Sequence, residues 1–305
     1  MELFQLFSNL NVPKGRIDAV LDTDTYNEVD DQFALAYMLK SDEKIDVKAV
    51  YAAPFYNDRS TSPGDGMRKS YDEIIKVLDL AGFGHYRDRV FLGSERYMPD
   101  ENTPVESDAM RDLIERAKNY TPKNPLYVVC IGAVTNVASA LSAAPEIAEN
   151  IVIVWLGGHD IHHRLGCREF NMMQDIAAAR VLFTSKAPLV QRPCAGVVSA
   201  FRIAEQEFQF WLKGKGALCD FLVDNVMQDE AHSMGRPWSR IVWDVTAVGW
   251  LLNQDGRFMD SVLMPCRIPE YDMRYACDAD AKTICYVNEI HRDALFEDLV
   301  KKLTK

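Results

Sequence analysis

VLDTDTYNEVDDQFALA, residues 20–36, is the stretch of sequence that decides the fold. Its apolar beginning completes a strand predicted over residues 17–21, and its apolar end lies in a helix predicted over residues 30–40. Five acids lie between the two apolar parts: Asp22, Asp24, Glu28, Asp30 and Asp31. Because ligands of open α/β sheets bind at the carboxyl ends of the strands, this junction is the first candidate for a functional site.

The rest of the chain repeats this alternation of short apolar runs and helical patterns, which is typical of a mostly parallel sheet with helices on its faces. Further strands are predicted at residues 47–52, 127–131, 151–156, 261–266 and 283–287. Further helices are predicted at residues 70–80, 136–143, 176–184, 241–252 and 294–303, and the pattern of residues 204–229 is mainly helical. We therefore expect one domain, residues 1–305, with an open, mostly parallel central sheet flanked by helices.

The composition narrows the class of protein. The chain has 305 residues, 48% of them hydrophobic and 26% charged, which is ordinary for a globular protein. Its formal net charge of −11 argues against nucleic acid and anionic membranes as partners, since both attract positive surfaces. Seven scattered cysteines without a CxxC pair indicate reduced thiols. The sequence shows no signal-peptide pattern and no apolar run of about 18 residues, the length that a membrane span needs, so we expect a cytoplasmic protein.

The acidic segment has both a structural and a chemical interpretation. Acids at a helix N-terminus cap free N–H groups and favour the helix dipole, which accounts for Asp30 and Asp31. It does not account for five acids within ten residues. Like charges so close together raise one another's pKa unless a cation compensates, and Ca²⁺ accepts six to eight oxygen ligands in irregular geometry. The segment therefore predicts a calcium site.

Two known acidic motifs fit less well. An EF-hand loop fails because the glycine at its sixth position and its terminal glutamate are missing. A phosphohydrolase of the haloacid dehalogenase type would use Asp22 as nucleophile and Asp24 as acid/base in a DxDxT motif. Tyr26 occupies the position of that threonine, and no convincing lysine and second acidic motif follow in order.

A third pattern fits the segment and continues along the chain. In the nucleoside hydrolase family a strand is followed by DxDPGxDD and an apolar helix. Later family motifs are Leu-Thr-Asn after a strand, a strand ending in Gly-Gly, Glu-Phe-Asn with Asp-x-x-Ala-Ala, and an Asp that opens a late helix. They are matched in family order by residues 131–136 (IGAVTN), 154–158 (VWLGG), 169–171 (EFN), 175–179 (DIAAA) and 244–248 (DVTAV). The chain thus resembles inosine-uridine preferring nucleoside hydrolases, as a divergent member.

This resemblance implies an N-ribohydrolase that cleaves the N-glycosidic bond of a ribonucleoside with a Ca²⁺-bound water and releases ribose and a free base. Asp24 would be the general base, and Asp22 would lie behind the metal site. The resemblance implies four Ca²⁺ ligands, of which the last acts through its backbone carbonyl: Asp24, Asp31, Asp244 and Thr135. It implies seven substrate contacts: Asp30, Asn57, His163, Glu169, Asn171, Trp243 and Asp244. A homodimer or homotetramer that serves nucleoside catabolism and purine salvage is a further implication.

The loop of residues 25–29 departs from the family pattern. It is two residues longer than the family's and has no glycine. The loop must bulge, so that Asn27 or Glu28 could enter the site as an extra ligand or ribose contact. An ordinary solvated Glu28 is the alternative.

Two further departures concern the substrate. Trp243 occupies the position where many family members have the histidine that protonates the leaving base. This proton must then come from another residue, for which His232 is one candidate. Alternatively, stacking of the indole on a purine replaces the protonation. The loop of residues 159–164 offers His162 and His163 where the family has an asparagine for the ribose 5′-hydroxyl. Because Trp243 is no acid, a non-catalytic relative that binds ribose or nucleosides is a second alternative. The base preference stays open.

Overall fold

The computed structural model describes residues 1–233 and 235–305. Within these residues an eight-stranded central sheet runs in the order β3-β2-β1-β4-β5-β6-β12-β9. All neighbouring strands in it are parallel except β12 and β9, which are antiparallel. Its strands are β1 (Ile17–Thr23), β2 (Ile45–Ala52), β3 (Val90–Phe91), β4 (Leu126–Cys130), β5 (Ile151–Leu156), β6 (Leu189–Arg192), β9 (Met259–Pro265) and β12 (Thr283–Ile290).

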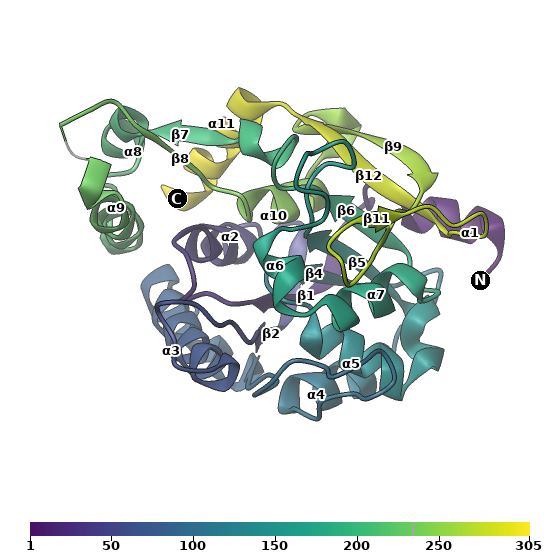
Figure 1. Cartoon of the computed structure of the whole chain (residues 1–305). Helices are drawn as coiled ribbons and strands as arrows, with labels where there is room; N and C mark the ends of the chain where they lie inside the picture. Colours follow the sequence, from purple (N-terminus) through teal and green to yellow (C-terminus); the bar gives the residue numbers. More distant parts are fainter. Residues whose placement is uncertain (234) are drawn as a thin grey trace.

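Both faces of the sheet are covered by helices because the central strands are apolar on both sides (Figure 1). Successive side chains of a strand point to opposite faces, so that Val128 packs into one apolar layer and Val129 into the other. Burying each such side chain contributes about 1.5–3 kcal/mol. One layer contains α2 (Asp30–Leu39), α3 (Pro63–Ala81), α8 (Glu205–Trp211), α9 (Ala217–Asp229), α10 (Val245–Leu251) and α11 (Arg292–Leu303). The other contains α4 (Asp108–Ala117), α5 (Thr135–Ala143) and α7 (Ile176–Thr184).

The remaining elements are short. The helix α1 (Leu3–Asn9) packs against the first layer, and α6 (Phe170–Gln174) contributes Met172 to the second. Two small antiparallel pairs join β7 (Arg202–Ala204) to β8 (Ser239–Ile241) and β10 (Ile268–Pro269) to β11 (Tyr275–Ala276). Short 3₁₀ helices are η1 (Gly84–Arg89), η2 (Pro145–Asn150), η3 (Val198–Ala200), η4 (Ala231–Ser233) and η5 (Gln254–Gly256). None of the helices in the described part of the chain is long and apolar enough to cross a membrane. The predicted fold class, an open and mostly parallel sheet flanked by helices, is confirmed.

Several predicted boundaries are wrong. The helix expected at 70–80 begins at Pro63, because Ser62 caps it by accepting a hydrogen bond from the Asp65 backbone N–H at 3.1 Å. The helical stretch 204–229 is two helices, because Gly214 and Gly216 between them have φ of +77° and +122°. The strand β6 lies at residues 189–192, where no strand was expected.

The fold places the acidic segment at the centre of the sheet. β1 lies between β2 and β4, and the loop of residues 24–29 connects its end to α2. The chain makes a long excursion between β6 and α10, in which α8 and α9 lie to one side of the central sheet, above α3 in Figure 1. It then returns so that the N-terminus of α10 packs against α2.

Candidate active site

A cavity of about 180 Å³ lies where β4 and β5 end and where α2 and α10 begin. Ile131 and Leu156, which stand at the two strand ends, form part of its lining. Six residues predicted for the site line it: Asp30, Asp31, Glu169, Asn171, Trp243 and Asp244. The carboxyl ends of parallel strands thus form the site, as the sheet rule requires.

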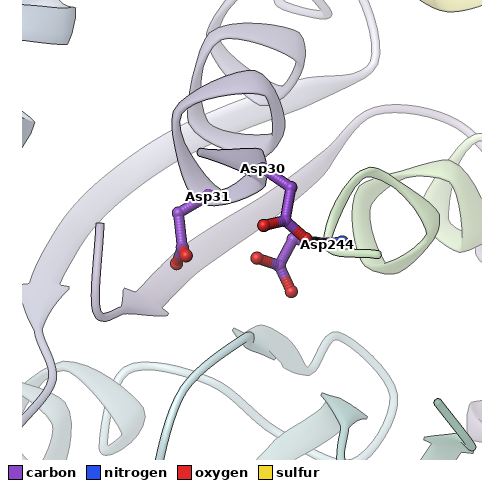
Figure 2. Close-up of side chains that lie close together, drawn as sticks. All are labelled: Asp30, Asp31 and Asp244. Atoms are coloured by element: carbon purple, nitrogen blue, oxygen red, sulfur yellow. Dashed lines mark hydrogen bonds between the residues drawn. The ribbon is translucent and has the colours of Figure 1, made fainter. Parts of the chain in front are cut away.

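Three of these residues meet at the junction of two helices (Figure 2). Asp30 and Asp31 form the first turn of α2, and Asp244 is the N-cap of α10. Figure 2 shows their carboxylates directed into one gap, and one oxygen of each lies within 4.8 Å of the others. The Asp244 backbone N–H donates to Oδ2 of Asp30 at 3.3 Å, and the Thr23 hydroxyl donates to Oδ1 of Asp31 at 2.6 Å. These bonds fix two of the carboxylates in place.

The protonation of this cluster is strongly perturbed. Burial and the charge of Glu28 raise the pKa of Asp30 to about 7, although Arg240 opposes the shift. Burial and then the charge of Asp30 raise the pKa of both Asp31 and Asp244 well above the usual range. Each carboxylate has lost water and gained negative neighbours, so the charged forms need a compensating cation.

Asp24 lies beside this cluster but is enclosed more completely. Both of its carboxylate oxygens are buried without a hydrogen-bond partner in the described structure. Burial and then the charge of Asp31 raise its pKa well above the usual range. Gly132 makes the close approach possible, because a Cβ at that position would lie 2.8 Å from Oδ1 of Asp24. Asp24 is not part of the cavity lining, so its predicted roles as base and ligand stay predictions.

Asp22 and Thr135 are each fixed by a buried side-chain hydrogen bond. Oδ1 of Asp22 accepts a hydrogen bond from Nδ2 of Asn136 at 2.8 Å, and burial raises the pKa of Asp22 to about 7. The Thr135 hydroxyl donates to Oδ2 of Asp175 at 2.7 Å, while Oδ1 of Asp175 accepts from the backbone N–H of Ala178 in α7. Asp175, whose role the sequence motif left unassigned, therefore connects the first residue of α5 to the first turn of α7. Full burial makes Asp22 a poor nucleophile, which counts against the phosphohydrolase alternative.

Glu169 and Asn171 are positioned through backbone hydrogen bonds. Glu169 is the N-cap of α6, and its carboxylate accepts from the backbone N–H groups of Gly158, Asn171 and Met172 at 2.9–3.1 Å. Asn171 donates both amide hydrogens, at 3.2 Å to the carbonyl of Ile131 and at 3.1 Å to that of Leu156. Only its carbonyl oxygen remains for a ligand.

The chemistry of the donors fits a hard divalent cation. The carboxylates of Asp30, Asp31 and Asp244 converge, and both oxygens of the neighbouring Asp24 lack a hydrogen-bond partner in the described structure. Carboxylate oxygens are the ligands that Ca²⁺ and Mg²⁺ prefer, and Ca²⁺ accepts the more irregular arrangement. The cluster contains Asp31 and Asp244 of the predicted ligands, but it includes Asp30 and does not include Asp24.

Comparison with known proteins identifies the family. Residues 64–293 match the family described as inosine-uridine preferring nucleoside hydrolase. The chain belongs to this family. The match begins after the acidic segment, which is where the sequence departs from the family pattern, and it includes the Glu-Phe-Asn motif and Asp244.

Individual nucleoside hydrolases resemble the chain at low identity. It is 31% identical over 129 residues to the "Probable uridine nucleosidase 2" of Arabidopsis thaliana, a match over 41% of this chain and 38% of that protein. The chain thus spans less than two fifths of that relative's length. It is 22% identical to a pyrimidine-specific ribonucleoside hydrolase of Citrobacter koseri, over 74% of this chain and 77% of that one. A purine-preferring ribonucleoside hydrolase from Gardnerella vaginalis has the same fold, with a TM-score of 0.70 and 21% identity over 94% of this chain and 98% of that one.

The loop of residues 25–29, which is longer than the family pattern, is held in place by Arg240. Oε2 of Glu28 accepts a hydrogen bond from Arg240 at 2.6 Å, and Arg240 also contacts Asp229 and Glu230 at the end of α9. Both Asn27 and Glu28 line the cavity, as one alternative for this loop predicted. Asn57 does not line it, so its predicted ribose contact stays a prediction.

The histidine-rich loop brings a different histidine to the cavity from the one predicted. His159 lines the cavity, and His163 stacks edge-on against it with ring centroids 4.4 Å apart. The backbone N–H of Ala195 donates to Nδ1 of His159 at 3.3 Å. Burial and then the charge of His163 lower the pKa of His159. His232, the other histidine considered, is exposed and lies near Glu230 instead.

Apart from apolar side chains, two lining residues were missed by sequence reasoning. His159 comes two residues after the predicted strand 151–156 and one after Gly158, and this position was its signal. Cys194 follows the unpredicted strand β6, so nothing in the pattern pointed to it.

Proposed function

We propose that the chain is a Ca²⁺-dependent ribonucleoside hydrolase that cleaves the N-glycosidic bond with water and releases ribose and a free base. The observation that carries the proposal is the convergence of three buried carboxylates, those of Asp30, Asp31 and Asp244, within 4.8 Å in a cavity. Membership of the nucleoside hydrolase family supports the same reaction.

The ligands proposed for Ca²⁺ are the carboxylates of Asp24, Asp31 and Asp244 and the backbone carbonyl of Thr135. Asp30 offers a further oxygen beside them. When bound, the cation supplies Lewis-acid activation of water. Convergence of residues from α2, α10 and the ends of β1 and β4 explains why the site needs the whole fold.

Asp24 is the proposed general base. Its oxygens have no hydrogen-bond partner in the described structure, so neither is occupied by a protein donor. A carboxylate whose pKa is raised by burial takes a proton from water more readily than an ordinary one. This supports Asp24 over Asp30, of which one oxygen already accepts the N–H of Asp244.

The surrounding carboxylates favour the transition state. Cleavage of a glycosidic bond builds positive charge on the ribose ring, which anions stabilise more than they stabilise the neutral substrate. Asp30 and Glu169 lie in the lining where such charge would develop. Glu169 and the carbonyl oxygen of Asn171 are the proposed acceptors for ribose hydroxyls, with His163, Asn57 and Asp244 as further contacts.

The base is proposed to stack on Trp243, which lines the same cavity. The similar proteins do not share one base preference, because one is described as pyrimidine-specific and another as purine-preferring. Activity on both kinds of base therefore has to be measured.

The experiment is a reducing-sugar assay on inosine, adenosine, uridine and cytidine, with calcium and with a chelator. We expect ribose release that the chelator abolishes and added Ca²⁺ restores. The variant Asp24→Asn should lose the activity, whereas Asp72→Asn, which removes the same charge from the exposed surface of α3, should keep it.

Three other results would overturn the proposal. Release that resists the chelator would exclude the cation. Binding of nucleosides without turnover would favour the non-catalytic relative. Phosphate release from p-nitrophenyl phosphate that is lost in Asp22→Asn would favour the phosphohydrolase. Light scattering tests the homodimer or homotetramer, which stays a prediction.

A further inference from the structure

Asn27, in the loop that is longer than the family pattern, faces the cavity with a defined polarity. The residue is only 5% exposed, and it lines the same cavity as the carboxylate cluster. Its backbone N–H donates to the carbonyl of Asp24 at 2.7 Å, which closes a tight turn and fixes the start of the side chain.

A chain of three hydrogen-bonding groups decides which end of the Asn27 amide faces the cavity. The backbone N–H of Arg59 donates to Oδ1 of Asn57 at 2.9 Å. A backbone N–H can only donate, so the amide nitrogen of Asn57 must point the other way. That nitrogen donates to Oδ1 of Asn27 at 2.6 Å. The oxygen of Asn27 is thereby used, and its Nδ2 carries the two remaining hydrogens.

These hydrogens are free for a ligand. Across residues 1–233 and 235–305, Nδ2 of Asn27 donates to no acceptor, yet this atom is not fully buried. The residue as a whole is only 5% exposed and it lines the cavity, so Nδ2 is accessible from the cavity. The neighbouring polar side chains of the loop and of α2 are the carboxylates of Glu28, Asp30 and Asp31, which can only accept when charged.

We propose that Asn27 is a specificity-determining residue of the hydrolase reaction that donates from Nδ2 to a carbonyl oxygen of the nucleobase. This inference rests on the proposed function. Asn27 lines the same cavity as Asp30 and Asp31, which the reacting carbon of the sugar must reach. Trp243, on which the base is proposed to stack, lines this cavity too, so the base is held in the space that Asn27 borders.

The donor selects one of two kinds of base. Uridine and cytidine differ at position 4, and inosine and adenosine at position 6, by a carbonyl oxygen in the first of each pair and an amino group in the second. A carbonyl accepts from Nδ2 of Asn27, whereas an amino group at the same place sets donor against donor. A site built for a hydrogen bond disfavours a substrate that leaves it unmade.

Two variants test the polarity directly. Asn27→Ala removes the donor and should lower kcat/KM for uridine or inosine about tenfold, mainly through KM, and leave cytidine and adenosine within about twofold. Asn57→Asp keeps the oxygen that accepts from Arg59 but can no longer donate to Asn27. The Asn27 amide should then turn its nitrogen toward the carboxylate introduced by that substitution and its own oxygen toward the cavity, so that the preference reverses in favour of the amino bases.

Ser60→Ala is the matched control in the same loop. The Ser60 hydroxyl accepts from the backbone N–H of Asn57 at 3.3 Å and donates to the carbonyl of Phe55 at 3.1 Å, without contact to Asn27. Its loss perturbs the loop but not the polarity of the amide. We expect the ratio of kcat/KM between carbonyl and amino bases to stay at the wild-type value.

The outcome separates this inference from the proposed function. A wild-type enzyme that hydrolyses nucleosides, with base ratios unchanged in both Asn27→Ala and Asn57→Asp, would refute the role of Asn27 alone. If the wild type releases no ribose, the hydrolase proposal fails. The ratio of the dissociation constants for inosine and adenosine, measured by isothermal titration calorimetry, then tests Asn27 by itself. Equal ratios in the wild type and the two variants would then overturn the inference.

Discussion

Removal of the cation at different pH values should expose the electrostatic cost of the carboxylate cluster. Asp30, Asp31 and Asp244 lie within 4.8 Å of one another. Two unit charges at that distance repel by about 3.5 kcal/mol at an effective dielectric constant of about 20, so the three pairs repel by about 10 kcal/mol. This is comparable to the whole stability of a typical protein. Without a cation, the folded protein must therefore take up protons.

The pKa shifts give the direction of the pH dependence. Burial and the charge of Glu28 raise the pKa of Asp30 from 3.8 to about 7, which corresponds to about 4 kcal/mol. A carboxyl group with a raised pKa in the folded state contributes stability that is fully present below about pH 4 and is lost as the pH rises through about 7. Asp22, whose pKa burial also raises to about 7, acts in the same direction. The chelated protein should thus lose stability between about pH 4 and about pH 8.

Thermal melting with EDTA or with Ca²⁺ measures the effect. At 100 times its dissociation constant, Ca²⁺ adds about 2.7 kcal/mol, or about 5 °C in Tm. We expect this gain at pH 8, where the carboxylates are charged, and a much smaller one at pH 5, where protons compete with the ion. Asp72→Asn should behave as the wild type, and Asp244→Asn should lose the gain. An equal Tm with and without Ca²⁺ at pH 8 would refute the reasoning.

Three further predictions concern single side chains. Asp24→Asn should lower kcat about 100- to 10,000-fold in the ribose assay and raise the Tm of the chelated protein, because it removes a buried charge without hydrogen-bond partners; a lower Tm would contradict this. Trp243→Ala should raise KM for purine nucleosides about tenfold, and Trp243→Phe should restore most of it, unless the indole does not stack. Arg240→Met should lower the free energy of unfolding in urea by about 2 kcal/mol, because Glu28 and its neighbours lose their cationic partner; no change would show that solvent replaces it.

The sequence predicted the fold class well because the pattern of apolar residues is local. Buried parallel strands such as residues 151–156 are continuous apolar runs, and they recur between helical patterns. The boundaries failed where local signals mislead. The first turns of α3 contain Gly64 and Gly66, which look unlike a helix, and Gly66 is required there because a Cβ would lie 2.1 Å from the carbonyl oxygen of Phe55. The four residues of β6 are too few for a clear pattern.

The sequence also predicted six of the residues that line the cavity, because each belongs to a motif that follows a strand or opens a helix. It could not place His159, and it left open whether Asn27 enters the site, since a side chain in a loop is directed by its tertiary contacts. Asn27 depends on Asn57, which lies 30 residues further along the chain. For the same reason the sequence predicted His163 and not His159. The contact between the two rings depends on how the loop folds, which the order of its residues does not reveal.

By itself the sequence determined the alternating layers of the fold, the family motifs and the presence of five acids after the first strand. These follow from residue type and spacing, which act over a few residues. Only the tertiary structure decided which acids meet. Asp30 and Asp244 are 214 residues apart, and they come together because α10 packs against α2 at the edge where the parallel strands end. It also decided the polarity of Asn27, since a hydrogen bond has a direction that only its partners in space can fix.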